Sequence, residues 1–126
     1  MTRFRRILGY LASVILLLSS AAHSILGWKQ LQQRAVDIHM PPDLLLSLKL
    51  GWLFGGAAML MFAVITWMLL WRNRDVLPVL VLGALYAAFG IWALTASKFD
   101  PFFSVFIVPG LLLVVAGWPS GKRQGT

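Results

Sequence analysis

The sequence contains no cysteine and no glutamate, and charged residues of both signs make up only 12% of its 126 positions. Soluble domains have about 25% charged residues, so water is not expected to be the main solvent for this chain. Without cysteine there is no disulfide exchange, no thiolate nucleophile and no cysteine-ligated metal. The lack of cysteine therefore excludes enzymes that depend on a cysteine pair, a cysteine nucleophile or a cysteine-bound metal.

Hydrophobic residues account for 60% of the chain, and they are gathered into long runs. A helix needs about 20 predominantly apolar residues to cross a bilayer. Four runs meet or approach this length, at about 7–27, 44–71, 76–96 and 102–118. The sequence therefore predicts an all-α integral membrane protein, a four-helix transmembrane bundle that forms one domain over residues 1–126. The first run also has the basic start of a secretory signal, but its length favours a retained span.

The segment between the first two runs is the only sizeable loop. Apolar residues recur at helical spacing over about residues 28–38, and polar residues fill the other side. We therefore expect a short amphipathic helix that lies at the membrane interface in the first outer loop. Pro41 and Pro42 end it, and Asp43 is available to cap the next helix. Asp100 followed by Pro101 predicts another helix start.

The basic residues give the expected orientation. One side of the membrane holds seven: Arg3, Arg5, Arg6, Arg72, Arg74, Lys122 and Arg123. The other side holds four: Lys29, Arg34, Lys49 and Lys98. The positive-inside rule predicts a multi-pass protein of the cell inner (plasma) membrane with both termini in the cytoplasm. The net charge of +7 is then explained by contact with lipid head groups. We expect the lipid bilayer as a partner, and no nucleic acid.

Small residues mark the faces on which the helices are expected to pack. In lipid, helices associate through close contact of small residues and through polar groups. The candidate packing residues lie on the first three spans: Gly9, Ser13, Gly51, Gly55, Gly83 and Ala87. Gly51 and Gly55 have the GxxxG spacing. Such a face serves the chain's own bundle or contact with another chain.

His23 is the span residue that most favours a functional interpretation, because an imidazole is expected about 7 Å below Trp28, inside the first span. A candidate ligand-binding pocket in the outer half of the bundle comprises His23, Ser20, Ser24, Lys49, Trp52, Trp92 and Ser104. One interpretation is a small-ligand or lipid-headgroup site. Another is a neutral histidine that bonds a serine or a backbone carbonyl across the bundle. Haem or chlorophyll ligation lacks a second ligand, so we expect no cofactor and no metal.

Four spans in a short chain are also found in the small multidrug-resistance transporters, which rely on a glutamate within the first span. This sequence has none, which excludes that assignment. No catalytic residue is evident, and we expect no enzyme activity. The first functional hypothesis is an accessory or structural subunit, or a homo-oligomer, in a membrane complex with other membrane subunits or with itself. The alternative is a binder or translocator of a small lipophilic or amphipathic molecule around His23.

Three short motifs carry a family resemblance. HSILGW over residues 23–28 closes the first span, LGW over 50–52 opens the second, and VPG over 108–110 lies in the last. With this layout the chain resembles uncharacterised small four-helix integral membrane proteins of bacteria. The resemblance implies the fold and the membrane location, and no activity.

Overall fold

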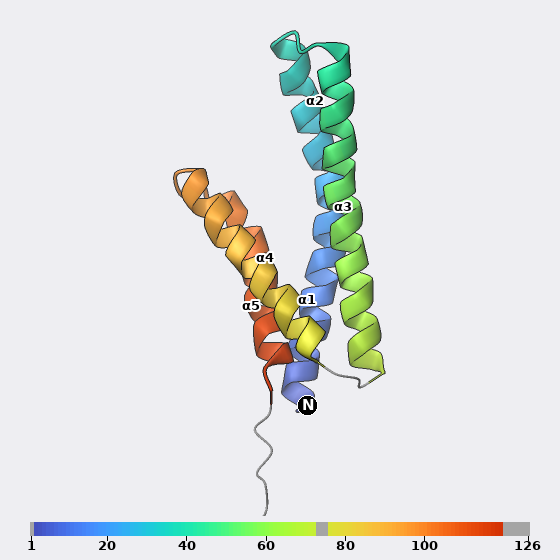
Figure 1. Ribbon diagram of the computed structural model, residues 1–126, viewed down its shortest axis with the longest axis vertical. Coiled ribbons are helices and arrows are strands. Elements are labelled where there is room, and N and C mark those ends of the chain that lie inside the picture. Colours follow the sequence, from blue (N-terminus) through green and yellow to red (C-terminus); the bar gives the residue numbers. More distant parts are fainter. Residues whose placement is uncertain (1, 73–75, 120–126) are drawn as a thin grey trace, which may run out of the picture.

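The computed structural model describes residues 2–72 and 76–119 (Figure 1). Within these ranges every regular element is a helix. The elements are α1 (Arg3–Ala22), the π-helical turn η1 (His23–Gly27), α2 (Trp28–Asp37), α3 (Pro42–Trp71), α4 (Leu77–Ala96), the 3-10 turn η2 (Pro101–Phe103) and α5 (Ser104–Gly117). The predicted all-α fold class is confirmed.

Three of the helical segments are long and apolar enough to cross a membrane: Arg3–Asp37, Pro42–Trp71 and Leu77–Ala96. A fourth apolar segment, Pro101–Gly117, is shorter. A span of about 20 apolar residues is the usual requirement. Length and composition therefore indicate a transmembrane protein.

The first helix does not end where the sequence predicted. α1, η1 and α2 form one continuous helical segment of 35 residues, and α2 runs beside α3 instead of turning away (Figure 1). Within η1 the backbone N–H of Trp28 bonds the carbonyl of His23, so the helical ladder passes Gly27 without a break. Residues 28–37 therefore continue the helix of α1, whereas the sequence predicted a separate interfacial helix over about residues 28–38. Amphipathic spacing identified a helix over 28–37, but it gave no information about the angle to the preceding helix.

The helix ends follow local chemistry. Pro42 occupies the first turn of α3 and Pro41 precedes it, as a missing N–H allows. Asp43 lies in that first turn and is not the capping residue. The Asp100 carboxylate accepts a hydrogen bond of 2.9 Å from the backbone N–H of Phe102, which confirms the predicted cap. The expected polar turn at residues 72–75 falls mostly outside the described residues.

The helices pair as two hairpins. The long segment α1–η1–α2 lies against α3, and α4 lies against α5 (Figure 1). In the second hairpin the backbones approach closely, because a Cβ added at Gly83 would lie only 2.6 Å from the backbone nitrogen of Val114. Small residues thus bring α4 and α5 together, as expected for helices in lipid.

The two hairpins meet at one end only. We call this end the base; it carries the N-terminus of α1, the end of α3 and the end of α5, and the opposite end is the open end (Figure 1). At the base α1 packs on both α3 and α5, and the core residues Leu16 and Leu113 are fully buried. The guanidinium of Arg5 donates a 2.8 Å hydrogen bond to the Trp118 carbonyl. Toward the open end α4 and α5 lean away from α3, which gives the molecule a V shape.

A buried threonine at α3 offers a test of the packing. Thr66 is fully buried, and its hydroxyl has no hydrogen-bond partner among the described residues. A buried polar group without a partner costs about 1–3 kcal/mol. We expect Thr66→Val to raise the free energy of unfolding by about 1 kcal/mol, measured by SDS titration in mixed micelles.

Thr95→Val is the matched control, because the exposed Thr95 hydroxyl already bonds the carbonyls of Ile91 and Trp92. Its stability is expected to change by less than about 0.5 kcal/mol. A loss of stability in Thr66→Val equal to that of a core truncation would contradict this account.

Candidate functional site

The divergence of the hairpins leaves two clefts above the base. The first has a volume of about 590 Å³ and lies between α3 and α4, with Gly51, Phe62 and Phe89 among its lining residues. The second has a volume of about 400 Å³ and lies between α1 and α5, with Ser19 and Phe102 in its wall. Ligand pockets in proteins typically measure about 300–1,000 Å³. Both clefts are therefore large enough for a small molecule.

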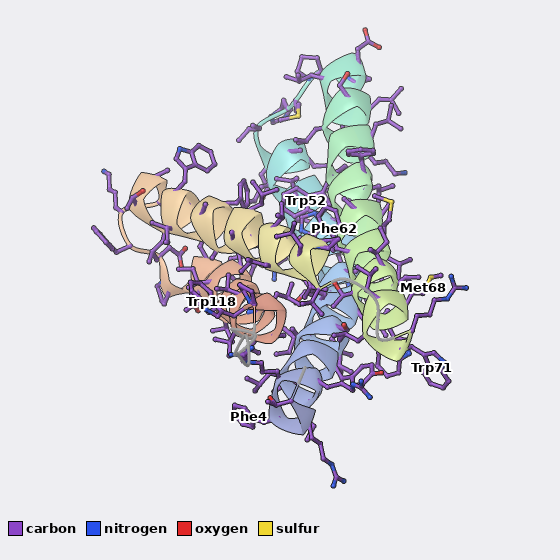
Figure 2. The ribbon with its side chains drawn as sticks, turned by 60° about the horizontal axis from the view of Figure 1, so that its bottom comes forward. Phe4, Trp52, Phe62, Met68, Trp71 and Trp118 are labelled. Carbon is purple, nitrogen blue, oxygen red and sulfur yellow. The ribbon has the colours of Figure 1, made fainter. Side chains whose placement is uncertain are left out.

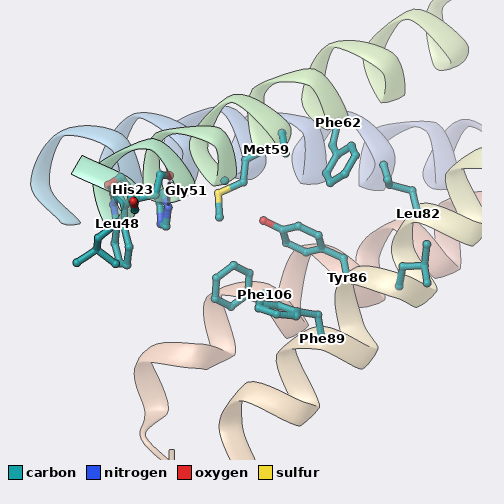
Figure 3. Close-up of a pocket in the computed structure, with 14 residues that line it drawn as sticks. His23, Leu48, Gly51, Met59, Phe62, Leu82, Tyr86, Phe89 and Phe106 are labelled. Carbon is teal, nitrogen blue, oxygen red and sulfur yellow. Dashed lines mark hydrogen bonds between the residues drawn. The ribbon is translucent and has the colours of Figure 1, made fainter. Parts of the chain in front are cut away.

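Five side chains separate the two clefts, since each of them lines both: His23, Trp52, Met59, Tyr86 and Phe106. We call this set the partition. The first three come from the first hairpin, and the other two come from α4 and α5. In Figure 3 the side chain of Tyr86 extends from α4 toward α3, and Met59 lies on the opposite wall. The partition is thus where the hairpins come closest in the upper part of the V.

His23 and Trp52 form a reciprocal pair within the partition. The His23 Nε2 atom lies 3.0 Å from the Trp52 carbonyl, and the Trp52 indole N–H donates a 2.8 Å hydrogen bond to the His23 carbonyl. The two rings are stacked, with centroids 4.2 Å apart and planes 8° apart. Because a carbonyl only accepts, His23 Nε2 carries a proton and donates it to the Trp52 carbonyl, and Nδ1 makes no hydrogen bond that shares in this pair.

Local sequence explains how this pair forms. His23 opens the π-helical turn, which ends at Gly27. A Cβ at Gly27 would lie 2.9 Å from the Trp52 ring, and one at Gly55 would lie 3.2 Å from His23 Nε2. The two glycines therefore make room for the stacked rings. Single π turns inside α-helices are frequent at functional sites.

Tyr86 is the unusual member of the partition. It lies near the middle of α4 and is only 8% exposed, and its hydroxyl has no hydrogen-bond partner among the described residues. Phe62 meets its ring edge-on at a centroid distance of 6.4 Å, and the Phe106 ring lies 5.5 Å away. The hydroxyl is thus held among apolar groups, where an unmet hydrogen bond is costly.

The chemistry of the walls is simple. The polar side chains that reach the clefts besides the partition are Ser19, Gln30 and Ser47, and none of the charged residues that the structure describes lines either cleft. Within residues 2–72 and 76–119 no group of three or more His, Cys, Asp or Glu is arranged to hold a metal. The clefts therefore offer apolar and aromatic surface with a few neutral hydrogen-bonding groups.

The structure brings together only part of the predicted pocket. Of its seven residues, His23 and Trp52 line the clefts. The Ser20 hydroxyl instead bonds the Gly56 carbonyl at 2.7 Å, in the contact between α1 and α3. Ser24 packs against the same glycine.

The other three predicted residues lie away from the clefts. The Lys49 ammonium lies 5.9 Å from the centroid of the Trp28 ring. Trp92 is 63% exposed, and its ring contacts Phe89. The Ser104 hydroxyl donates a hydrogen bond to the carbonyl of Pro101 within its own turn. All three lie near helix ends at the open end of the V.

The predicted packing residues also separate into two groups. A Cβ at Gly9 would meet Leu70 of α3 at 2.6 Å, and Ser13 is buried beside it with its hydroxyl on the Gly9 carbonyl. Gly55 faces His23, and Gly83 and Ala87 lie in the tight contact with α5. At Gly51 a Cβ would meet nothing within 4 Å. Gly51 therefore widens the first cleft instead of bringing two helices together.

Tyr86, Met59 and the phenylalanines of the clefts were not among the predicted site residues. The residues predicted from sequence gather around His23 close to the interface, whereas Tyr86 lies near the centre of its helix. A tyrosine between the small residues Gly83 and Gly90 was the available signal, because small neighbours let another helix approach its ring.

Comparisons with protein-family models, with curated proteins and with solved structures found no match to this chain. The function of the clefts is therefore inferred from the residues that line them, above all from the five side chains of the partition.

Proposed function

We propose that this protein binds a small lipophilic or amphipathic molecule in the clefts between its two helical hairpins. The observation that carries the proposal is the first cleft. Its volume is about 590 Å³, its walls are apolar and aromatic, and the His23–Trp52 pair borders it. Pockets for small molecules are mostly apolar and contain a few well-placed polar groups. Both clefts have this composition. Binding of a small molecule is therefore the function that their chemistry supports.

The proposal includes a topology. We propose four spans in the cell inner membrane, with the base and both termini on the cytoplasmic side. Arg3, Arg5 and Arg6 at the base support this orientation through the positive-inside rule. Three of the other basic residues counted on that side, Arg74, Lys122 and Arg123, lie outside the described residues. Exposed aromatic residues also support interfaces at the two ends: Figure 2 shows Trp71 pointing away from the bundle at the base, and Trp92 is exposed toward the open end.

In this orientation the clefts lie in the outer half of the membrane. The wall of the first cleft extends along α3 from Ser47 to Phe62, which is about 22 Å at helical rise. One half of the hydrocarbon core is about 15 Å thick. With Trp71 at the inner interface, Phe62 lies about 14 Å above it, near the bilayer centre, and Ser47 lies about 36 Å above it, just beyond the hydrocarbon core. This depth suits a molecule that enters sideways from the outer leaflet.

Filling the first cleft tests the proposal. Gly51 and Ala58 lie two turns apart on α3 and both line this cleft. The double variant Gly51→Phe/Ala58→Phe would occupy it without a backbone clash at position 51, where the space is open. Native mass spectrometry of the full-length protein in lipid nanodiscs should detect a small adduct on the unsubstituted protein. We expect the double variant to lose at least about 90% of it, since the filled cleft excludes the molecule.

Leu50→Phe/Ala57→Phe is the matched control. It adds the same kind of bulk one residue earlier on the same helix, at exposed positions that line neither cleft. This variant should keep the adduct. Retention of the adduct by both variants, or its absence from the unsubstituted protein, would contradict the proposal.

The accessory-subunit or homo-oligomer hypothesis also has one supporting observation. A wall of about 22 Å on α3 matches four turns of a helix, so a transmembrane helix from another chain fits beside it. That occupant would appear in the same mass spectra as stoichiometric foreign subunits or as multiples of 14.0 kDa, with no small adduct.

A further inference from the structure

The hydroxyl of Tyr86 is a buried polar group that the fold leaves without a partner. Nearly all buried polar groups in proteins have a hydrogen-bond partner, so an exception calls for an explanation. The rings of Phe62 and Phe106 beside it offer no acceptor. In the partition, His23 Nε2 and the Trp52 indole N–H already bond each other's carbonyls. The described chain therefore orients this hydroxyl but does not satisfy it.

The surroundings of Tyr86 define what would satisfy it. Within residues 2–72 and 76–119 no charged residue lines either cleft, so an ionised group placed there would be buried without a counter-charge from these residues. A ligand hydroxyl would bring a donor of its own that needs a further acceptor in this apolar environment. A carbonyl oxygen needs only the one donor that Tyr86 supplies. The best match is a neutral carbonyl group.

The aromatic residues indicate the shape of the group that bears this carbonyl. Phe62 and Phe106 contact the ring of Tyr86, and Phe89 packs edge-to-face on Phe106 at 5.2 Å. Figure 3 shows these rings on both sides of the gap between α3 and α4. Aromatic side chains favour offset-stacked or edge-to-face contact with another flat ring. A flat ring is therefore better suited to this wall than a plain alkyl chain.

We propose that the bound molecule is a neutral, ring-bearing lipid of the quinone or cyclic ketone class, and that its carbonyl oxygen accepts a hydrogen bond from Tyr86. This inference rests on the proposed function and specifies the ligand of the same clefts. The apolar tail of such a lipid extends along the cleft wall, and its ring lies at the partition. Met59 is a flexible side chain that lines both clefts and lies across from Tyr86 in Figure 3, and it moves aside to admit the ring to the hydroxyl.

The test compares two probes that differ in their ring: decyl-benzoquinone, which has carbonyls, and decylbenzene, which has none. Binding to the full-length protein in nanodiscs is measured by calorimetry, for the unsubstituted chain and for Tyr86→Phe. We expect the unsubstituted chain to bind the quinone about tenfold more tightly than decylbenzene, as one buried hydrogen bond implies. Tyr86→Phe should lose about this factor for the quinone and leave decylbenzene binding unchanged. The infrared carbonyl stretch of the bound quinone should shift to lower frequency only when Tyr86 is present.

Each other outcome has a distinct meaning. Equal affinity for the two probes, with no effect of Tyr86→Phe, overturns the ligand class and leaves cleft binding standing. No binding of either probe overturns the proposed function as well. Tyr86→Phe is expected to fold normally, since it keeps the ring and removes only the unpartnered hydroxyl. A thermal unfolding scan of the free variant checks this, and a midpoint at or above that of the unsubstituted protein is the required result.

Discussion

Replacing Gly83 with alanine is expected to destabilise the protein by about 1–3 kcal/mol, although only one methyl group is added. The added Cβ would lie 2.6 Å from the Val114 backbone nitrogen and 2.7 Å from the Gly110 carbonyl oxygen. Both atoms belong to the backbone of α5, so no side-chain rotation relieves the overlap. The two helices must move apart, and the second hairpin loses one of its close backbone contacts. SDS titration followed by far-UV circular dichroism measures the loss.

Gly51→Ala is the control for the intrinsic effect of removing a glycine. It is also in a helix interior, but its Cβ position is open. Alanine is favoured over glycine in helices by about 1 kcal/mol, so this variant should be as stable as the unsubstituted protein or more so. If Gly83→Ala were as stable as Gly51→Ala, the close approach of α4 and α5 would be wrong.

The separation of α4 and α5 in Gly83→Ala should also change the clefts. Tyr86 lies one turn from Gly83 on α4, and Phe106 comes from α5. When the hairpin separates, both side chains leave the partition. We therefore expect ligand binding to fall together with stability in Gly83→Ala, whereas the Gly51 and Ala58 double variant loses binding alone.

The helices themselves were predictable because the signals for them are local. Apolar runs, prolines in first turns and the Asp100 cap predicted the ends of the other three spans within a few residues of those observed, whereas the first helical segment continues to Asp37. Tight pairing of α4 with α5 is also understandable from sequence, since Gly83 and Ala87 lie on one face. These features depend on residues close together in the chain.

The V shape and the partition were not predictable, because they depend on contacts between distant residues. The direction of residues 28–37 is set by the π turn and by Trp52, which is more than twenty residues further along the chain. Hydropathy likewise gives the length of α4 but not the angle at which it leaves α3. The pairing of His23 with a backbone carbonyl was among the interpretations of this residue, whereas its indole partner was not.

The pair of His23 and Trp52 is expected to show strong energetic coupling. Trp52→Ala should destabilise the protein by about 3–5 kcal/mol, because it removes a large ring and a hydrogen bond to the His23 carbonyl. His23→Ala removes the stacked partner and the bond to the Trp52 carbonyl. Since each single change already breaks the pair, the double variant should lose less than the sum of the two. The difference is expected to be about 1–3 kcal/mol in a double-mutant cycle by SDS titration.

Trp92→Ala supplies the control, because Trp92 is 63% exposed and lines neither cleft. Combined with His23→Ala, it should give additive losses of stability within about 0.5 kcal/mol.

Quinone binding by single variants separates two roles of His23. If the histidine serves packing alone, quinone binding should fall in His23→Ala only as far as in Trp52→Phe, which keeps a ring at the partition but loses the indole N–H. A larger fall in His23→Ala would mean that Nδ1, or the imidazole ring itself, contacts the bound molecule. Additive losses for His23 and Trp52 would contradict the reciprocal pair, and with it the physical basis of the partition.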